Sequence, residues 1–170
     1  MNTKKLPMSW KEVELGEISE ITSSKRIYEN EYTNQGVPFY RSKEVIELSK
    51  GEELSIELFI SNKRYNELRE KFGVPKRGDL LITAVGTIGK SYVVPDDKMF
   101  YFKDGNLLWI KNIKNLEPIY LNYFLFNYFK KNKNNLSAGT AYSALTIINL
   151  KKLKIPLPPL ETQKKIDHAT

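Results

Sequence analysis

The chain has 170 residues, of which 41% are hydrophobic and 12% aromatic, so it can form one domain with a substantial core. The absence of cysteine excludes disulfide frameworks, thiolate zinc sites and cysteine nucleophiles, and the single histidine, His168, lies too close to the end of the sequence for a packed triad or metal cluster. Lys and Arg exceed Asp and Glu by 27 to 20, and this net charge of +7 favours a polyanionic partner such as nucleic acid.

The first predicted element covers residues 10–21, which have an apolar side and a turn near Gly16. A polar loop, residues 22–36, follows and contains Lys25 and Arg26. Loops of this composition are usually solvated, so these two cations are interpreted either as contacts to phosphate or as plain surface charge.

Residues 37–45 (VPFYRSKEV) are predicted to form a short strand that leaves a turn. Arg41, Ser42 and Lys43 stand where this strand emerges. Two hydrogen-bonding cations at a strand end are candidates for a binding site.

A helix is predicted to begin after Ser61, because serine caps helix N-termini and apolar residues then recur on one face at Tyr65, Leu68 and Phe72. Gly73 is placed to end this helix.

A buried strand is predicted at residues 80–85 (LLITAV), because this apolar, partly β-branched run is bounded by turns. We expect residues 92–94, 99–102 and 107–110 to be its sheet partners.

A second helix is predicted from apolar residues at i, i+3, i+4, i+7 and i+8, namely Leu121, Phe124, Leu125, Tyr128 and Phe129. Lys130, Lys131 and Lys133 suit the negative end of its dipole. A polar loop at residues 134–143 leads into a segment of alternating character that ends in IPLPPL, residues 155–160. A further helix is expected to begin at Glu161.

The string AVGTIGKS, residues 84–91, differs by one residue from the phosphate-binding pattern GxxxxGK[ST]. That pattern needs a helix after the lysine, whereas Lys90 is followed by the β-branched SYVVP. We therefore predict a hairpin with a glycine-rich turn at Gly86 to Gly89. Its tip, with Thr87 and Lys90, either lies in a DNA groove or is an ordinary tight turn.

No catalytic constellation is recognised. The only Pro-Pro pair is followed by Leu160, which excludes the aromatic methyltransferase signature, and Asp96 and Asp97 lie in a turn where carboxylates are usually solvated. No apolar run approaches the roughly 20 residues that span a membrane, and the basic start lacks the apolar core of a signal peptide. We expect a soluble, cytoplasmic protein without a membrane partner.

Several segments, in this order, resemble one target-recognition half of the specificity subunit of type I restriction-modification systems. GDLL followed by GTIGK, with IPLPPLE some 60 residues later, is the most specific part of the resemblance, which covers almost the whole chain. The matching pieces are WKEVELGEI (10–18), GVPFYRSKEV (36–45), RGDLLITAVGTIGKSYVV (77–94), NLLWIK (106–111) and SAGTAYSALTIINLKKLKIPLPPLETQKKI (137–166).

The resemblance implies an α+β recognition domain, residues 1–160, with a twisted, mostly antiparallel sheet and small packed helices. The start of a long spacer helix, residues 161–170, would follow. The implied function is sequence-specific binding of double-stranded DNA, reading one half of a bipartite site, without catalysis. The family carries two recognition domains, whereas one is present here with about ten residues of the helix, so we expect a half-subunit, a truncated product or a fragment.

The implied partners are double-stranded DNA, methyltransferase and restriction subunits, and a second copy or second recognition domain. S-adenosylmethionine, ATP and magnesium would belong to the partner subunits, with no cofactor or metal in this chain. The competing interpretation is a protein-interaction module or decoy that assembles with methyltransferase subunits without binding DNA well.

The resemblance implies that lysine and arginine bind DNA phosphates and that a few loop side chains contact base edges. Arg41 is the first candidate for base contact, because guanidinium can grip guanine O6 and N7, or else it forms an ion pair with Glu44 or Glu47. The predicted DNA-binding residues are Lys25, Arg26, Arg41, Ser42, Lys43, Thr87, Lys90, Thr140, Tyr142 and Ser143. Tyr142 is equally compatible with the core.

Overall fold

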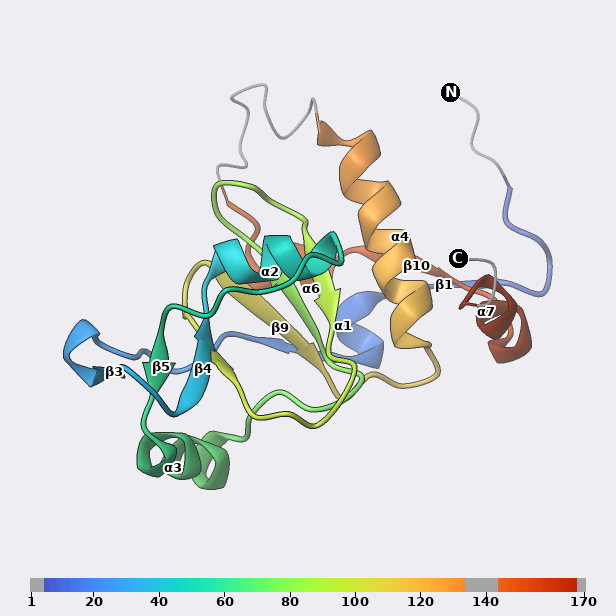
Figure 1. Ribbon diagram of the computed structural model, residues 1–170. Helices are drawn as coiled ribbons and strands as arrows, with labels where there is room; N and C mark the ends of the chain where they lie inside the picture. The colour runs from blue at the N-terminus through green and yellow to red at the C-terminus, as the bar shows by residue number, and fades with distance from the viewer. Residues whose placement is uncertain (1–4, 134–143, 168–170) are drawn as a thin grey trace.

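The computed structural model describes residues 5–133 and 144–167, and it has the mixed α and β architecture predicted from the sequence (Figure 1). In chain order, its elements are β1 (Lys11–Glu14), α1 (Leu15–Ile18), β2 (Glu20–Thr22), η1 (Glu29–Glu31), β3 (Tyr32–Thr33), β4 (Val37–Tyr40), α2 (Ser42–Ser49), β5 (Phe59–Ile60), α3 (Asn62–Phe72), β6 (Leu80–Thr83), β7 (Ser91–Val93), β8 (Tyr101–Phe102), β9 (Leu107–Lys111), α4 (Pro118–Lys131), α6 (Ile147–Lys151), β10 (Lys154–Leu157) and α7 (Leu160–Asp167).

The central sheet has the strand order β2-β9-β6-β7, and all its pairs are antiparallel. β6 pairs with β7 from Leu80 opposite Val93 to Ile82 opposite Ser91. The predicted hairpin is therefore confirmed, and a strand follows the glycine-rich turn where a phosphate-binding loop would need a helix. β9 is the other neighbour of β6, as expected for residues 107–110.

The second sheet has the order β3-β5-β4-β8, and its β4–β8 pair is parallel, with Phe39 opposite Tyr101. The expectation that residues 99–102 pair in the same sheet as β6 is therefore wrong. Tyr101 and Phe102 are 1% and 0% exposed and fill the core beside β4. An apolar pattern predicts a strand here, but it does not identify the partner of that strand.

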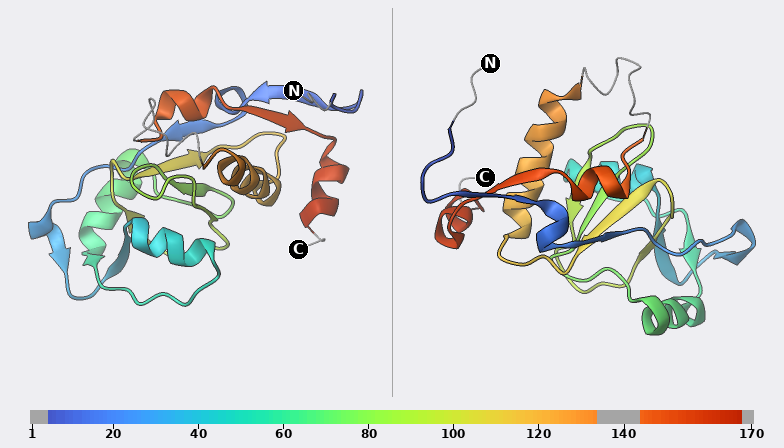
Figure 2. Two further views of the ribbon diagram at one scale, coloured as in Figure 1. Left: turned by 90° about the horizontal axis from the view of Figure 1, so that it is seen from above. Right: turned by 180° about the vertical axis from the view of Figure 1, so that it is seen from behind.

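The N-terminal segment forms three short elements rather than the single element expected at residues 10–21. β1 pairs antiparallel with β10, and Figure 2 shows these two strands side by side at one edge of the molecule. Gly16 lies within α1 instead of in a turn. A Cβ at this position would lie 2.9 Å from the Cβ of Lys151, so the glycine permits close packing of α1 on α6.

The strand predicted at residues 37–45 ends early, because β4 stops at Tyr40 and α2 begins at Ser42. Arg41 is the N-cap residue, and its backbone N–H donates to the Glu44 carboxylate at 2.7 Å. The Glu44 side chain thereby caps the start of the helix by accepting an N–H that would otherwise be unpaired, and the backbone changes here from extended to helical.

The central sheet is buried on both faces, which explains the continuous apolar run in β6. On one face, Leu81 and Trp109 pack in a cluster that also contains Leu68 of α3 and Val45 of α2. On the other face, the cluster includes the α4 side chains Leu121, Leu125 and Phe129. Helices thus cover both faces of the sheet and hold its loops at fixed positions.

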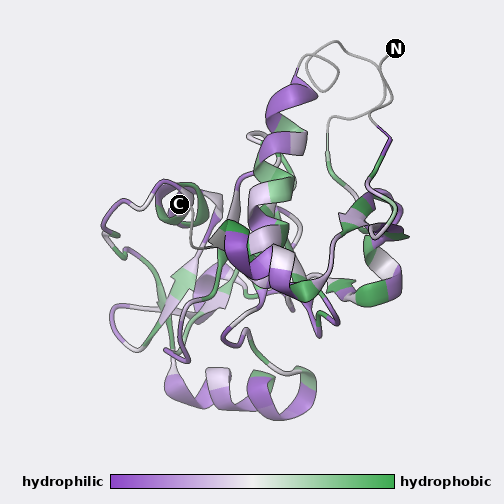
Figure 3. Ribbon diagram, turned by 90° about the vertical axis from the view of Figure 1, so that its right-hand side faces the viewer, coloured by the Kyte–Doolittle hydropathy of each residue, from purple (hydrophilic) through white to green (hydrophobic). Residues whose placement is uncertain are grey.

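The two helices with the clearest apolar periodicity are both confirmed. Ser61 caps α3, and its hydroxyl oxygen accepts the Arg64 N–H at 3.1 Å. Gly73 follows the last turn as predicted, whereas Phe72 is 47% exposed rather than buried. In Figure 3 the α3 ribbon along the bottom is mostly hydrophilic, as expected for a helix with a single buried face.

The segment of alternating character before IPLPPL contains the short helix α6, which the sequence analysis missed. Thr146 caps it by accepting the Asn149 N–H at 3.1 Å. The helix expected after the prolines is present as α7, where Gln163 is 0% exposed. The Gln163 amide donates to Pro158 and Asn115 carbonyls and accepts the Glu117 N–H, so α7 is fixed against the start of α4.

Candidate nucleic-acid interface

The β6–β7 hairpin holds a tight, anchored tip. The Lys90 N–H donates to the Thr83 hydroxyl oxygen at 2.9 Å, and the Gly89 N–H donates to the Thr83 carbonyl at 2.9 Å. A Cβ on Gly89 would lie 2.6 Å from the Cβ of Phe129, so the turn rests directly on α4. Thr87 is exposed at the tip. The structure therefore presents this predicted site residue to solvent on a rigid support.

Lys90 joins the C-terminal half of α4 in one cationic group. Its Nζ lies 5.9 Å from the centre of the Phe126 ring, and the Nζ of Lys130 lies 5.8 Å from the same centre. Phe126 itself is 49% exposed. The sequence pattern predicted Lys130 and Lys131 only as charges at the end of a helix. The i,i+4 spacing from Phe126 to Lys130 was a local signal, but the contribution of Lys90 depends on the tertiary fold.

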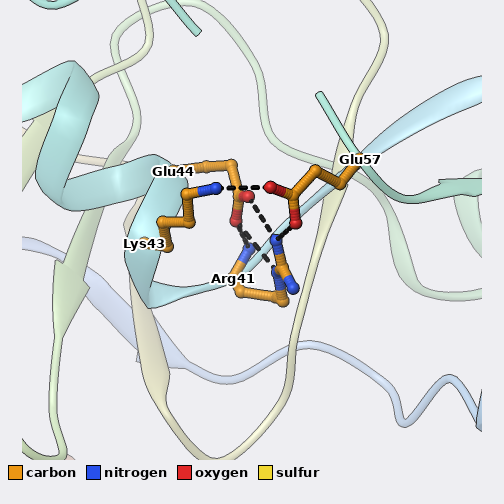
Figure 4. A network of polar contacts seen from close by, with 4 residues as sticks. All are labelled: Arg41, Lys43, Glu44 and Glu57. Atoms are coloured by element: carbon orange, nitrogen blue, oxygen red, sulfur yellow. Dashed lines mark hydrogen bonds and ion pairs between the residues drawn. The ribbon is translucent and has the colours of Figure 1, made fainter. Parts of the chain in front are cut away.

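A second polar group lies at the start of α2, where Arg41 and Lys43 meet two carboxylates (Figure 4). The Arg41 guanidinium donates to Glu44 at 2.8 and 3.3 Å and to Glu57 at 2.8 Å. The Lys43 Nζ lies 2.5 Å from the other Glu57 oxygen. Glu44 is 1% exposed, whereas the Glu57 side chain is 50% exposed. We call these four residues the α2 clasp.

Contacts within the α2 clasp lower the pKa of one acidic group and raise the pKa values of the two basic groups. Hydrogen bonds from Lys43 and then Arg41 lower the pKa of Glu57 to about 2. Hydrogen bonds to Glu44 and then Glu57 raise the pKa of Arg41, and the hydrogen bond to Glu57 raises the pKa of Lys43. Arg41, Lys43 and Glu57 are therefore all charged at neutral pH.

The hydrogen bonds of Arg41 limit its predicted contact with a DNA base, because they occupy N–H groups of its guanidinium. A bidentate contact to guanine needs two N–H groups on one edge of the guanidinium. The Nε–Nη2 edge faces Glu44, and the second Nη2 hydrogen is used by Glu57. The predicted ion pair with Glu44 is present, whereas the second partner, Glu57, lies 16 residues away in the chain and was not predicted. Ser42 Oγ is buried without a hydrogen-bond partner among the described residues.

The α2 clasp and the cationic group of Lys90 lie at opposite ends of α2. Lys43 is in its first turn, while Ser49 and Lys50 at its end line a pocket of about 380 Å³ together with Lys90 and Tyr123. α2 has 8 residues and is thus about 12 Å long at a rise of about 1.5 Å per residue. This helix length is similar to the width of the DNA major groove, about 12 Å.

Lys25 and Arg26 are not part of either group. The Lys25 Nζ lies 4.6 Å from the centre of the Phe72 ring at the end of α3, and Arg26 pairs with Asp104 at 3.1 Å. Figure 1 shows α3 at the bottom of the molecule, whereas α2 and the C-terminal half of α4 lie in its upper part. The remaining predicted residues, Thr140, Tyr142 and Ser143, lie outside the described residues.

The family model of the type I restriction modification DNA specificity domain matches residues 7–168. The chain belongs to this family. The order of motifs in the sequence predicted this family.

Two curated relatives of this specificity domain are themselves specificity subunits. A putative type I restriction enzyme specificity subunit of Haemophilus influenzae is 36% identical over 157 residues, which make up 92% of this chain and 38% of that protein. The putative type I restriction enzyme MjaX specificity subunit of Methanocaldococcus jannaschii is 39% identical over 95 residues, 52% of this chain and 22% of that protein. The chain thus spans well under half the length of these relatives.

Solved structures share the fold of this specificity domain. The HsdS subunit of Thermoanaerobacter tengcongensis superposes with a TM-score of 0.71 at 23% identity, covering 99% of this chain and 38% of that one. A chain from a study of assembly and conformational transition of the type I R-M system gives a TM-score of 0.75, also at 23% identity, with 99% and 39% coverage. These likenesses support the α+β recognition fold.

The GDLL motif of the specificity domain has a structural role. The Asp79 carboxylate accepts the Lys76 N–H and the Trp109 Nε1–H, both at 2.9 Å, and it is 9% exposed. Burial raises the pKa of Asp79. Leu80 and Leu81 are fully buried on opposite faces of the central sheet. The motif therefore holds the hairpin in place instead of contacting a ligand.

Residues 5–133 and 144–167 contain neither a membrane-spanning helix nor a metal-binding cluster. These residues contain no helix with the length and apolar character needed to cross a membrane. In the same part of the chain, no three His, Asp or Glu side chains are grouped so that they could hold a metal ion.

Proposed function

We propose that this specificity domain binds double-stranded DNA in a sequence-specific manner and reads one half of a bipartite target. Membership of the DNA specificity domain family carries this proposal. The anchored hairpin tip and the cations Lys90 and Lys130 beside it support the proposal, because an exposed polar turn flanked by lysines can contact both phosphates and base edges.

In this proposal, affinity arises mainly from lysines that displace counterions from phosphates, while exposed hydroxyl and amide groups at the hairpin tip read base edges. Lys90 and Lys130 bind backbone phosphates beside the tip, and Thr87 reaches into the groove. The support of the turn by α4 reduces the conformational entropy that binding must remove.

The domain would serve a complex in which methyltransferase and restriction subunits hold S-adenosylmethionine, ATP and magnesium. A second recognition domain, or a second copy of this chain, would read the other half of the target. The structural neighbour with a TM-score of 0.75 comes from a study of complex assembly of the type I R-M system, which is consistent with such partners.

The test is duplex binding measured across a range of salt concentrations. Six to eight phosphate contacts predict that log affinity falls against log salt with a slope of about 5 to 7 in magnitude, since each contact contributes about 0.9. Lys90→Ala should reduce this slope by about 0.9. Lys114→Ala, an exposed lysine that precedes α4, is the matched control and should leave the slope unchanged. A flat response would favour the protein-interaction module instead.

A further inference from the structure

The α2 clasp has the composition of an anion-binding site that is already filled. Arg41 and Lys43 place one donor each on the same carboxylate, at 2.8 and 2.5 Å, and that carboxylate belongs to Glu57 (Figure 4). A phosphate offers oxygen acceptors and negative charge of the same kind to such a pair of donors.

The two carboxylates of the clasp differ in how firmly they are held. Glu44 is 1% exposed and accepts the Arg41 backbone N–H as well as its guanidinium, so it is a fixed part of the start of α2. Glu57 is half exposed, lies between α2 and β5, and its side chain makes hydrogen bonds only to Arg41 and Lys43 among the described residues. Exposed ion pairs are weak in water, so Glu57 is the carboxylate that can be displaced.

We propose that Glu57 occupies, in the free domain, the site at which Arg41 and Lys43 bind a backbone phosphate of DNA. The inference rests on the proposed function and adds a regulation of it: an internal carboxylate competes with phosphate and lowers affinity for DNA in general. Departure of Glu57 also frees the Nη1–Nη2 edge of Arg41, while Glu44 still holds the other edge.

The ionisation of Glu57 is consistent with a competitor that acts at all physiological pH values. Its neighbours lower the pKa of its carboxyl group to about 2, so protonation does not release it. Only a stronger or more concentrated anion can do so, and duplex DNA has a high local density of phosphate charge.

The test compares Glu57→Gln with Glu12→Gln in the full chain. Each variant removes one negative charge from a glutamate whose side chain is 50% exposed and pairs with a lysine, since Glu12 lies 3.8 Å from Lys154. Affinity for a duplex of unrelated sequence should rise about three- to tenfold more in Glu57→Gln than in Glu12→Gln, as expected for loss of two exposed ion pairs. The slope of log affinity against log salt should steepen by about 0.9 in Glu57→Gln alone.

A double variant identifies the cation responsible. Adding Lys43→Ala to Glu57→Gln should remove most of the gain, and circular dichroism of each variant checks that the fold is retained. Equal gains in Glu57→Gln and Glu12→Gln, or a gain without a steeper slope, would overturn the inference while leaving the proposed function intact if the wild-type chain binds DNA. Failure of every variant and of the wild type to bind duplex would overturn both.

Discussion

The Glu44 carboxylate, which is 1% exposed, receives three hydrogen bonds from the single residue Arg41. The backbone N–H donates at 2.7 Å, and Nη2 and Nε donate at 2.8 and 3.3 Å. A charge this deeply buried is tolerated because it is paired and hydrogen-bonded. Arg41 is thus a structural residue at the start of α2, whatever it contributes to DNA binding.

Arg41→Ala should therefore destabilise the fold by about 2–3 kcal/mol, because it leaves a buried carboxylate without its charged partner. Urea unfolding followed by tryptophan fluorescence measures the change. Lys43→Ala, which removes an exposed cation from the same helix turn, should cost about 0.5 kcal/mol or less. Equal losses in the two variants would contradict the structural role of Arg41.

Asp79→Ala should cost about 2–4 kcal/mol, because the Lys76 N–H and the Trp109 Nε1–H both lose a buried acceptor. Asp79→Asn keeps one acceptor oxygen and should cost less. Asp97→Ala is the control, since Asp97 is exposed and accepts a single N–H from Arg77 at 3.3 Å. If unfolding free energies showed no difference between Asp79→Ala and Asp97→Ala, the role assigned to the GDLL motif would be wrong.

Gly89→Ala should destabilise the hairpin by about 2–4 kcal/mol, because the added methyl group overlaps Phe129 and the residue has a φ of 84°. Gly86 has a φ of 73° but open space around it, so Gly86→Ala should cost only about 1–2 kcal/mol. Chemical denaturation of both variants compares them directly. A larger loss for Gly86→Ala would show that the turn does not rest on α4 as described.

The stability contributed by Glu57 should be lost in acid. Lys43 and Arg41 lower its pKa from 4.5 to about 2 in the folded chain, so between these values the unfolded chain binds more protons than the folded one. Stability from this group is therefore fully present above pH 4.5 and decreases as the pH falls toward 2. The difference in unfolding free energy between the wild type and Glu57→Gln should shrink over this range and stay constant from pH 6 to 8. A difference that changed in the neutral range would contradict the assigned pKa shift.

The sequence predicted those helices and strands in which apolar residues are continuous or recur at a regular spacing. β6 is apolar throughout because both faces of its sheet are covered, and α4 shows its buried stripe at Leu121, Leu125 and Phe129. α2 was missed because residues 37–45 read as one extended segment. A helix begins there instead, and the Glu44 carboxylate caps its start by accepting the Arg41 backbone N–H.

The candidate site was less predictable than the fold, because its parts meet through tertiary packing. Glu57 reaches Arg41 from 16 residues away, and Lys90 lies near the same Phe126 ring as Lys130 only because the hairpin rests on α4. Their sequence neighbours give no sign of these contacts. The motif order identified the family, whereas the placement of individual cations required the structure.

Selection from a pool of duplexes with a randomised central segment tests most directly whether this domain reads DNA sequence. The pool is incubated with the chain at roughly physiological salt, and the bound fraction is sequenced. Our account predicts enrichment of one short motif, which should weaken in Thr87→Ala because that side chain stands at the hairpin tip. A bound fraction with the same base composition at every position as the starting pool would contradict it.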